Sequence, residues 1–338
     1  MKKFLTIALT LILSLTFIFS LVGCKDEPAN DDGGNNNPPP HSCTLDTDTL
    51  IYKEKDGKLY VGYKCKTCYE ITATESVVDV DVIIEPGDLQ ISEKLASIET
   101  GDVVVYKTGL HNDYLPASKT GVRVVGENGA SFPVVSLSNV SNVTYENFNI
   151  TNLTLENGNS LLTFKNCKFT RGINNIMHLV TDLTFDGCRF IDQNTDKESA
   201  IILRYFSNLT IKNCIFQNVA YNALQIGENQ SDGTLLIENN TFKYVGSRVV
   251  YIAGTTGLTS CSIVGNKFYD NEDAYLDPEG VNDGIKKSDG IYIKVSGGNK
   301  TVVNVGINYW ENIPEDDNKY ITTDAVYDAS VQLEIAKN

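Results

Sequence analysis

Leu162-Thr-Phe-Lys-Asn-Cys-Lys-Phe169 is one copy of a motif that recurs along the middle of this 338-residue chain. In most copies apolar and polar residues alternate and an Asn or Gly follows, and in all but the first copy two further residues lead to a Phe. The Asn or Gly stands at positions 147, 166, 187, 213, 239 and 265, so successive copies lie 19 to 26 residues apart. The alternation predicts a half-buried strand, and the Asn or Gly predicts a bend with left-handed backbone geometry.

A period of about 20–30 residues with one strand per unit indicates stacked coils, because one coil cannot bury its own inward face. The register predicts a Phe column that points inward and a column of buried thiols beside it. The Phe column consists of Phe169, Phe190, Phe216, Phe242 and Phe268, and the thiol column of Cys167, Cys188 and Cys214. Cys261 is also expected to be a buried thiol, at an inward-facing strand position. We also expect the turn asparagines to hydrogen-bond one another along the axis. The Leu-x-x-Leu-x-Leu pattern of a leucine-rich repeat is absent.

With these repeats the chain resembles a right-handed parallel β-helix of the pectin-lyase-like kind, an all-β fold, over residues 80–318. A short amphipathic helix within Leu89–Ile98 is predicted to cap its N-terminal end, because the apolar positions 91, 95 and 98 share one helical face. Residues 319–338 alternate again and are predicted to close the other end.

The N-terminal segment predicts export. Lys2-Lys3 and an apolar run to Val22 form a signal peptide over residues 1–23. The tetrad Leu21-Val22-Gly23-Cys24 resembles the bacterial lipobox, which implies cleavage and lipidation at Cys24. A plain signal peptide or a single membrane anchor is the alternative. Residues 24–40 are rich in Asn, Gly and Pro and predict a disordered tether. We therefore expect a lipid-anchored protein at the cell membrane or outer surface, outside the cytoplasm.

Residues 41–75 predict a small separate module. His41, Cys43, Cys65 and Cys68 have the count and spacing of a tetrahedral zinc site and resemble a zinc-ribbon-like module. A disulfide with a spare thiol is the competing interpretation, since an exported chain meets oxidising surroundings, and neither is the third. The residues between these cysteines predict a hairpin that turns at Asp56-Gly57.

Charge limits the partners. The chain has 28 basic and 43 acidic residues and a formal net charge of −15, so nucleic acid and anionic lipid are poor partners. Membrane contact is expected through the lipid anchor alone, and the protein is expected to be a monomer. Six carboxylates lie within Asp270–Asp283, where either a calcium site or a solvated insertion can be predicted.

A second strand per coil is predicted at Ile176–Val180, Ala200–Phe206, Ala223–Gly227, Val249–Ala253 and Gly290–Val295. These strands would place five residues in one outward row, about 4.8 Å apart along the axis, with Arg171 and Arg248 flanking it. The row consists of His178, Arg204, Gln225, Tyr251 and Tyr292. Aromatic faces suit sugar rings and an arginine suits a carboxylate. The alternative is that every solenoid displays some polar row outward.

Leu203-Arg204-Tyr205 is similar to the Leu-Arg-His-Gly element of the chondroitinase-B/alginate-lyase family. The resemblance implies β-elimination, in which a base removes a proton beside a uronic carboxylate and a cation stabilises the enolate. His178 and Arg204 are the candidate base and cation. The chain departs from the family at Tyr205, which stands where the family has His, and it lacks the Asn-Lys-Ser element and the clustered Glu ligands for calcium.

These features predict a surface protein that recognises an extracellular polysaccharide, with or without cleaving it. A non-catalytic adhesin or a structural spacer is the alternative, because fold alone does not determine function.

Overall fold

The computed structural model describes residues 44–67, 71–112, 115, 120–175, 178–193, 198–227, 233–253, 258–269, 291–294, 302–310, 321–324 and 331–333. The chain divides into two compact units, Met1–Leu50 with Gly62–Glu75 and Ile51–Val61 with Ser76–Asn338. No helix within the described ranges has the length and apolar character needed to cross a membrane. The predictions for Cys24, His41, Cys43, Cys68 and Asp270–Asp283 fall outside the described residues.

The first strands form a three-stranded sheet in the order β1-β2-β3, with β1 at Leu45–Lys55, β2 at Lys58–Cys65 and β3 at Ile71–Asp79. The predicted hairpin is confirmed, because β1 and β2 are joined by Asp56 and Gly57. Both turn residues have left-handed φ angles, 53° and 73°, as a tight two-residue hairpin turn requires.

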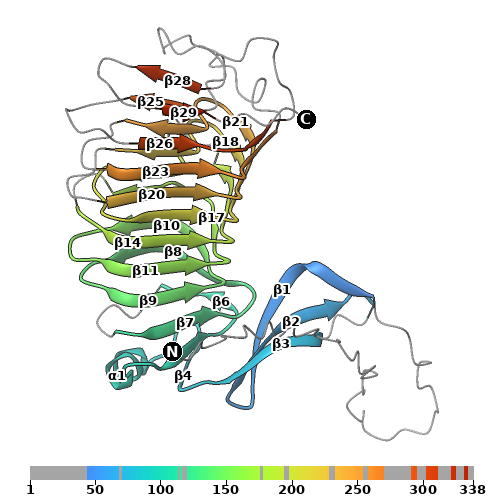
Figure 1. Cartoon of the computed structure of the whole chain (residues 1–338). Coiled ribbons are helices and arrows are strands. Elements are labelled where there is room, and N and C mark those ends of the chain that lie inside the picture. The colour runs from blue at the N-terminus through green and yellow to red at the C-terminus, as the bar shows by residue number, and fades with distance from the viewer. Residues whose placement is uncertain are drawn as a thin grey trace, which may run out of the picture. The chain divides into compact units, whose positions relative to one another are not determined.

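The solenoid is a right-handed parallel β-helix, as predicted, and one eleven-stranded parallel sheet runs along its whole length (Figure 1). We call it sheet 1. Its strands are β4 (Val82–Ile84), β5 (Val103–Tyr106), β7 (Val122–Gly126), β9 (Ser141–Glu146), β11 (Ser160–Lys165), β14 (Thr181–Asp186), β17 (Leu209–Lys212), β20 (Gly233–Glu238), β23 (Leu258–Val264), β26 (Val302–Val305) and β29 (Val331–Leu333). Each strand of sheet 1 pairs with its counterpart in the next coil, which is the stacking that the repeat predicts.

The other strands form a fifteen-stranded sheet with two branches that meet at β10. The second face comprises β6 (Gly109–Leu110), β8 (Ala130–Leu137), β10 (Asn149–Leu155), β12 (Lys168–Phe169), β15 (Arg189–Gln193), β18 (Ile215–Val219), β21 (Thr241–Val245), β24 (Lys267–Tyr269) and β27 (Tyr309–Trp310). The third face comprises β13 (Ile173–Asn175), β16 (Ile201–Leu203), β19 (Leu224–Ile226), β22 (Val250–Ile252), β25 (Ile291–Lys294) and β28 (Ile321–Asp324). The long strand β10 pairs with both β12 and β13, so the second and third faces separate only after it.

One helix, α1, spans Ile91–Ser97, between β4 and β5. Its Ile91 and Leu95 pack against the solenoid core, and Ile98, just beyond its end, is fully buried. The apolar positions that the sequence places on one helical face are therefore the ones that meet the core.

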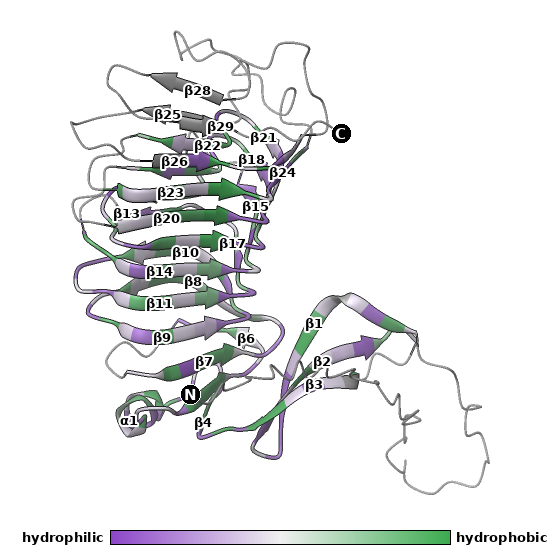
Figure 2. Cartoon of the chain, in the orientation of Figure 1, coloured by the Kyte–Doolittle hydropathy of each residue, from purple (hydrophilic) through white to green (hydrophobic). Residues whose placement is uncertain are grey.

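The Phe column is confirmed. Phe169, Phe190, Phe216, Phe242 and Phe268 are buried and stack face to face, with ring centroids 4.6 to 5.2 Å apart. A shorter stack of Tyr145, Phe164 and Phe185 continues the aromatic core from sheet 1. Figure 2 shows hydrophobic residues within the strands and hydrophilic ones at many of the corners. The period-two pattern therefore decides which side chains enter the core.

The thiol prediction is also confirmed: Cys167, Cys188, Cys214 and Cys261 are buried and form no disulfide. Burial raises the pKa of the Cys261 thiol to about 12, so this sulfur stays protonated and unreactive at neutral pH.

The bends follow the prediction, but the asparagine ladder lies one residue later than expected. Residues 147, 166, 187, 213, 239 and 265 all have left-handed φ angles between 53° and 68°. The turn asparagines bond to other groups; Asn213, for example, donates to Asp186 at 2.8 Å. The continuous amide ladder is formed by the buried residues that follow the bends, Asn240, Asn266 and Asn308. A side chain at the bend points away from the interior, whereas the next one points into it.

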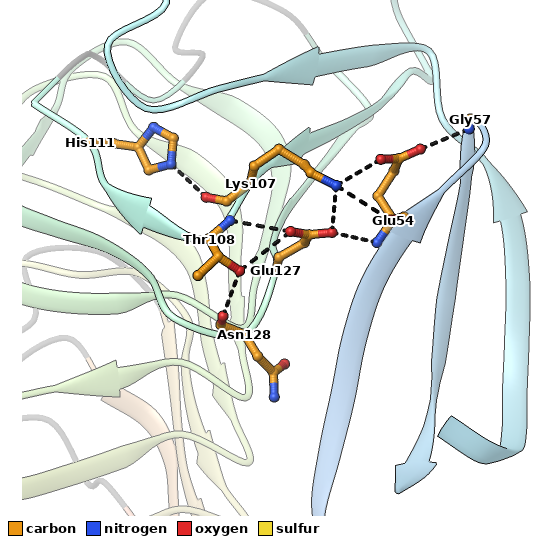
Figure 3. Close-up of polar contacts among 7 residues, drawn as sticks. All are labelled: Glu54, Gly57, Lys107, Thr108, His111, Glu127 and Asn128. Atoms are coloured by element: carbon orange, nitrogen blue, oxygen red, sulfur yellow. Dashed lines mark hydrogen bonds and ion pairs between the residues drawn. The ribbon is translucent and has the colours of Figure 1, made fainter. Parts of the chain in front are cut away.

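The hairpin end Ile51–Val61 belongs to the same compact unit as the solenoid, and an ionic cluster joins them (Figure 3). Lys107 lies 2.8 Å from both Glu54 and Glu127. The buried carboxylate of Glu127 also accepts hydrogen bonds from the backbone nitrogens of Glu54 and Thr108. Tyr52 accepts a hydrogen bond from Asn166, and burial raises the pKa of this phenol to about 12. Polar contacts thus join the hairpin end Ile51–Val61 to the solenoid.

Candidate functional site

The predicted outward row divides into two positions on the third face. Register pairs Gln225 with Tyr251 and Tyr251 with Tyr292, and it places Ile202 before them. Arg204 does not belong to this row, because its neighbour Leu203 pairs with Ile226, beyond Gln225. The prediction of one row was therefore wrong for Arg204 and His178, and right in register for Gln225, Tyr251 and Tyr292. The side chain of Tyr292 lies outside the described part of the chain.

His178 and Arg204 fall outside the row because the strand near His178 was predicted at the wrong residues. The predicted strand Ile176–Val180 is instead β13 at Ile173–Asn175, where the Ile173 side chain is fully buried. Asn175 pairs with Leu203, 28 residues on, while Val180 bridges Phe206, 26 residues on. The corner after β16 is therefore two residues shorter than the corner after β13. His178 and Arg204 both lie two residues before this bridge, at the C-terminal edge of the third face.

A hollow of about 240 Å³ opens beside Arg204, lined also by Tyr205, Gln225, Gly227 and Ala253. The residues that follow the paired strand ends Leu203, Ile226 and Ile252 are Arg204, Gly227 and Ala253. The two coils after Arg204 thus carry almost no side chain at its position, which leaves the space empty. A Cβ on Gly227 would lie 2.6 Å from the Arg204 Cα, so the close approach of these coils requires glycine.

The polar groups of the hollow differ in how firmly they are held. Gln225 Oε1 accepts a hydrogen bond from the buried Ser199 hydroxyl at 3.0 Å, and Asn222 donates to that hydroxyl at 3.3 Å. These contacts engage the side-chain oxygen of Gln225 and orient its amide, so the side-chain nitrogen can donate a hydrogen bond to a ligand. Arg204 is exposed, and within the described ranges no hydrogen bond or ion pair holds its guanidinium. The hollow therefore presents one fixed amide and one cation that is available to a ligand.

Arg248, at the opposite edge of the third face, contacts Tyr251 in the row of Gln225. The Arg248 guanidinium stands 4.6 Å from the centroid of the Tyr251 ring, within cation–π range. Arg248 precedes β22 and the exposed Arg171 precedes β13, so both lie at the N-terminal edge. With strands of three residues, this edge is roughly 10 Å from the edge that carries Arg204. The predicted flanking arginines thus lie across the face from the hollow.

His178 contacts Asn157, a partner that the sequence analysis did not identify. Its Nδ1 lies 2.6 Å from the Asn157 side-chain oxygen, which can only accept, so Nδ1 carries the proton. In the neutral ring Nε2 is then the basic nitrogen. This contact orients the ring.

Within the described part of the chain, no three His, Cys, Asp or Glu side chains cluster as metal ligands. Of the four residues predicted to hold zinc, only Cys65 is described; it is buried, and its sulfur accepts the backbone N–H of Thr67 at 3.4 Å. The choice between zinc and a disulfide remains a prediction.

The residues that create the hollow escaped the sequence analysis. Gly227 and Ala253 carry no polar group, and they matter only through what they leave empty. A signal did exist, since Gly227 and Ala253 are the last residues of two predicted second strands, one and two coils after Arg204. It could be used only after the corner lengths were known.

Residues 120–307 match the family described as right handed beta helix region. Among solved structures, a pectin methylesterase mutant in complex with a hexasaccharide is similar, with 9% identity, a TM-score of 0.28, and coverage of 73% of this chain and 94% of that one. No curated protein matches the chain.

Proposed function

This chain belongs to the right-handed β-helix family, and from that starting point we propose that its third face binds an extended extracellular polysaccharide. One sugar unit is seated in the hollow beside Arg204. Neighbouring units lie along the coils, over Gln225 and toward Tyr251. The proposal includes display at the cell surface through the lipidation predicted at Cys24.

The observation that carries the proposal is the unengaged guanidinium of Arg204 beside an oriented amide. A charge-assisted hydrogen bond from arginine to a carboxylate is among the stronger polar contacts in proteins. The Ser199 contact holds the Gln225 amide in place before any ligand arrives, so little order is lost when the ligand binds.

The size of the hollow favours a polymer over a separate small molecule. At about 240 Å³ it is smaller than the range of ~300–1,000 Å³ that small-molecule sites commonly span. A polymer needs only one unit in the hollow, because its other units can contact the outward row of adjacent coils about 4.8 Å apart.

Tyr251 extends this site along the face. A tyrosine ring provides a flat apolar surface with a polar tip, which suits the face of a sugar ring. Arg248 at 4.6 Å adds positive charge to the same place. The proposal concerns binding alone, and cleavage by β-elimination is measured separately in the experiment below.

The test measures binding of a uronic-acid polymer and of a neutral polymer to the purified protein. We expect Arg204→Gln to weaken binding of the acidic polymer by about 1.5–3 kcal/mol, the range for a hydrogen bond to a charged group. Lys165→Gln, which removes the same charge from the exposed end of a sheet 1 strand, is the matched control and should bind normally.

Two further variants separate shape from charge. Ala253→Leu should fill the hollow and weaken both polymers without altering any charge, and Tyr251→Ala should also weaken both. Normal binding by the Arg204 and Tyr251 variants would place the site elsewhere. If the wild-type protein binds no glycan, the spacer interpretation stands. Absorbance of an unsaturated product, lost in His178→Ala, would add turnover to binding.

A further inference from the structure

The second face carries a charge opposite to that of the whole chain. Its strands β12, β15, β18, β21, β24 and β27 contain four basic side chains and one carboxylate, whereas the chain has 28 basic and 43 acidic residues. The carboxylate, Asp192, accepts a hydrogen bond from Asn218 at 2.7 Å. We call the outward residues Lys168, Arg189, Lys243, Lys267, Tyr269 and Tyr309 the basic strip.

Register orders the basic strip into two parallel rows. Lys168 pairs with Arg189, and three coils later Lys267 pairs with Tyr309 in the same row. Lys243 pairs with Tyr269 in the row beside it. Adjacent coils are about 4.8 Å apart along the axis, so the four cations, from Lys168 to Lys267 four coils on, span roughly 19 Å. The tyrosines gather at one end, where the Tyr269 and Tyr309 rings lie 5.5 Å apart.

A strained tyrosine borders the basic strip. Tyr244 has a φ angle of 55°, which is unfavourable for a bulky side chain. The corresponding bends of the two preceding coils hold Asp192 and Asn218, residue types that tolerate this conformation better. Lys243 lies 4.7 Å from the Tyr244 ring. Backbone strain of this kind clusters at functional sites, and an aromatic ring beside a cation suits ligand binding.

A groove lies on the same face beyond Lys168. It has a volume of about 220 Å³ and is lined by Lys168, Thr170, Asn149, Ser131, Pro133 and Leu110 among others. Its lining mixes apolar surface with hydroxyl and amide groups. The basic strip therefore continues into a hollowed surface.

We infer that the second face is a second binding surface, one for a linear acidic polysaccharide that lies along the solenoid axis. Lysine and arginine pair with its carboxylates, and the tyrosines stack on its rings. Nucleic acid fits less well, because four cations over roughly 19 Å are sparser than one phosphate per ~3.4 Å of strand. This surface shares no residue with the hollow at Arg204, so either site can exist without the other.

The experiment uses the purified full chain, with polygalacturonate as the acidic probe and its fully methyl-esterified form as the neutral counterpart. Lys243→Gln with Lys267→Gln should weaken binding of polygalacturonate by about tenfold or more and leave the ester nearly unaffected. Tyr269→Ala with Tyr309→Ala should weaken both polymers, because stacking does not depend on the charge of the sugar. Higher salt should reduce the effect of the lysine variants.

The matched control is Lys165→Gln with Lys212→Gln, which removes two charges from sheet 1. Equal binding of polygalacturonate by the two double-lysine variants would overturn the inference. The inference would also be overturned if the wild-type protein did not bind polygalacturonate. A single-stranded oligonucleotide that bound as tightly as polygalacturonate, and lost as much affinity in the Lys243 and Lys267 variant, would overturn it too. If Arg204→Gln weakens binding and the Lys243 and Lys267 variant does not, the third-face site stands and the basic strip fails. The reverse result separates them the other way.

Discussion

Two halves of the solenoid fill the same interior position with different chemistry. The residue after the bend is a thiol in three successive coils, Cys167, Cys188 and Cys214, and an amide in the next three, Asn240, Asn266 and Asn308. All six are buried. Each of these side chains donates a hydrogen bond to a backbone carbonyl of the preceding coil. These carbonyls occupy one position of sheet 1, so both halves present the same acceptor to the interior residue.

The thiol and the amide form hydrogen bonds of different strength to this carbonyl. Cys188 Sγ lies 3.3 Å from the Phe164 carbonyl oxygen, and an S–H group is a weak donor. Asn240 Nδ2 lies 2.8 Å from the Ile211 carbonyl oxygen, and its Oδ1 also accepts the backbone N–H of Cys214 at 2.8 Å. Asn240 Nδ2 also donates to Asn266 Oδ1 of the next coil at 3.0 Å. The amide therefore joins the coils on both sides, whereas the thiol acts mainly as a small hydrophobe.

The difference teaches how a solenoid interior can vary without losing its fold. Burial raises the pKa of the Cys188 thiol well above its usual value, so it stays neutral and costs nothing in unpaired charge. An amide is polar, and its burial costs free energy unless it is hydrogen-bonded. It therefore occurs as an unbroken ladder, in which each member satisfies the next.

The largest effect should come from breaking the Phe column that runs through both halves. Phe216→Asp buries a carboxylate with no partner, which costs several kcal/mol, and the solenoid should unfold. Circular dichroism melting measures it. Gln217→Asp, on the adjacent outward position, is the control and should melt near the wild-type temperature. Wild-type-like melting of Phe216→Asp would contradict the inward register.

The next effect separates the two halves directly. Asn266→Ala removes the acceptor for both the backbone N–H and the side-chain amide of Asn240, and should cost about 2–4 kcal/mol. Cys188→Ala removes only a buried sulfur and should cost about 1 kcal/mol. Denaturant unfolding of both variants measures the difference. Equal losses would show that the amide ladder adds no more than packing.

The smallest effect concerns an exposed residue near the start of β11, in the coil that contains Cys167. Leu161 has a φ angle of 52°, at a position where the adjacent coils hold Asn142 and Asp182 in the same conformation. Leu161→Asn should relieve strain and stabilise the protein by about 1 kcal/mol. A higher denaturation midpoint with an unchanged slope would support this, whereas a lower midpoint would mean that the exposed leucine has a packing role.

Much of the fold could be predicted because its signals are local and repeated. Apolar alternation around Leu162, Leu183 and Leu209 set the phase of sheet 1, and the following Asn or Gly marked each bend. The Phe column and the buried thiols followed from that phase by counting. The predictions were less accurate for residues farther along the coil from the sheet 1 strand. The strand expected at residues 176–180, for example, was found at Ile173–Asn175.

The sequence by itself determined the coil, its inward columns and its bends, because each depends on side chains within a few residues. Only the tertiary structure decided which outward residues meet. Corners differ in length by a residue or two, and a shift of that size moves a side chain to another row or another face. The hollow beside Arg204 and the basic strip both depend on the register between coils, which is set by the packing of the whole solenoid.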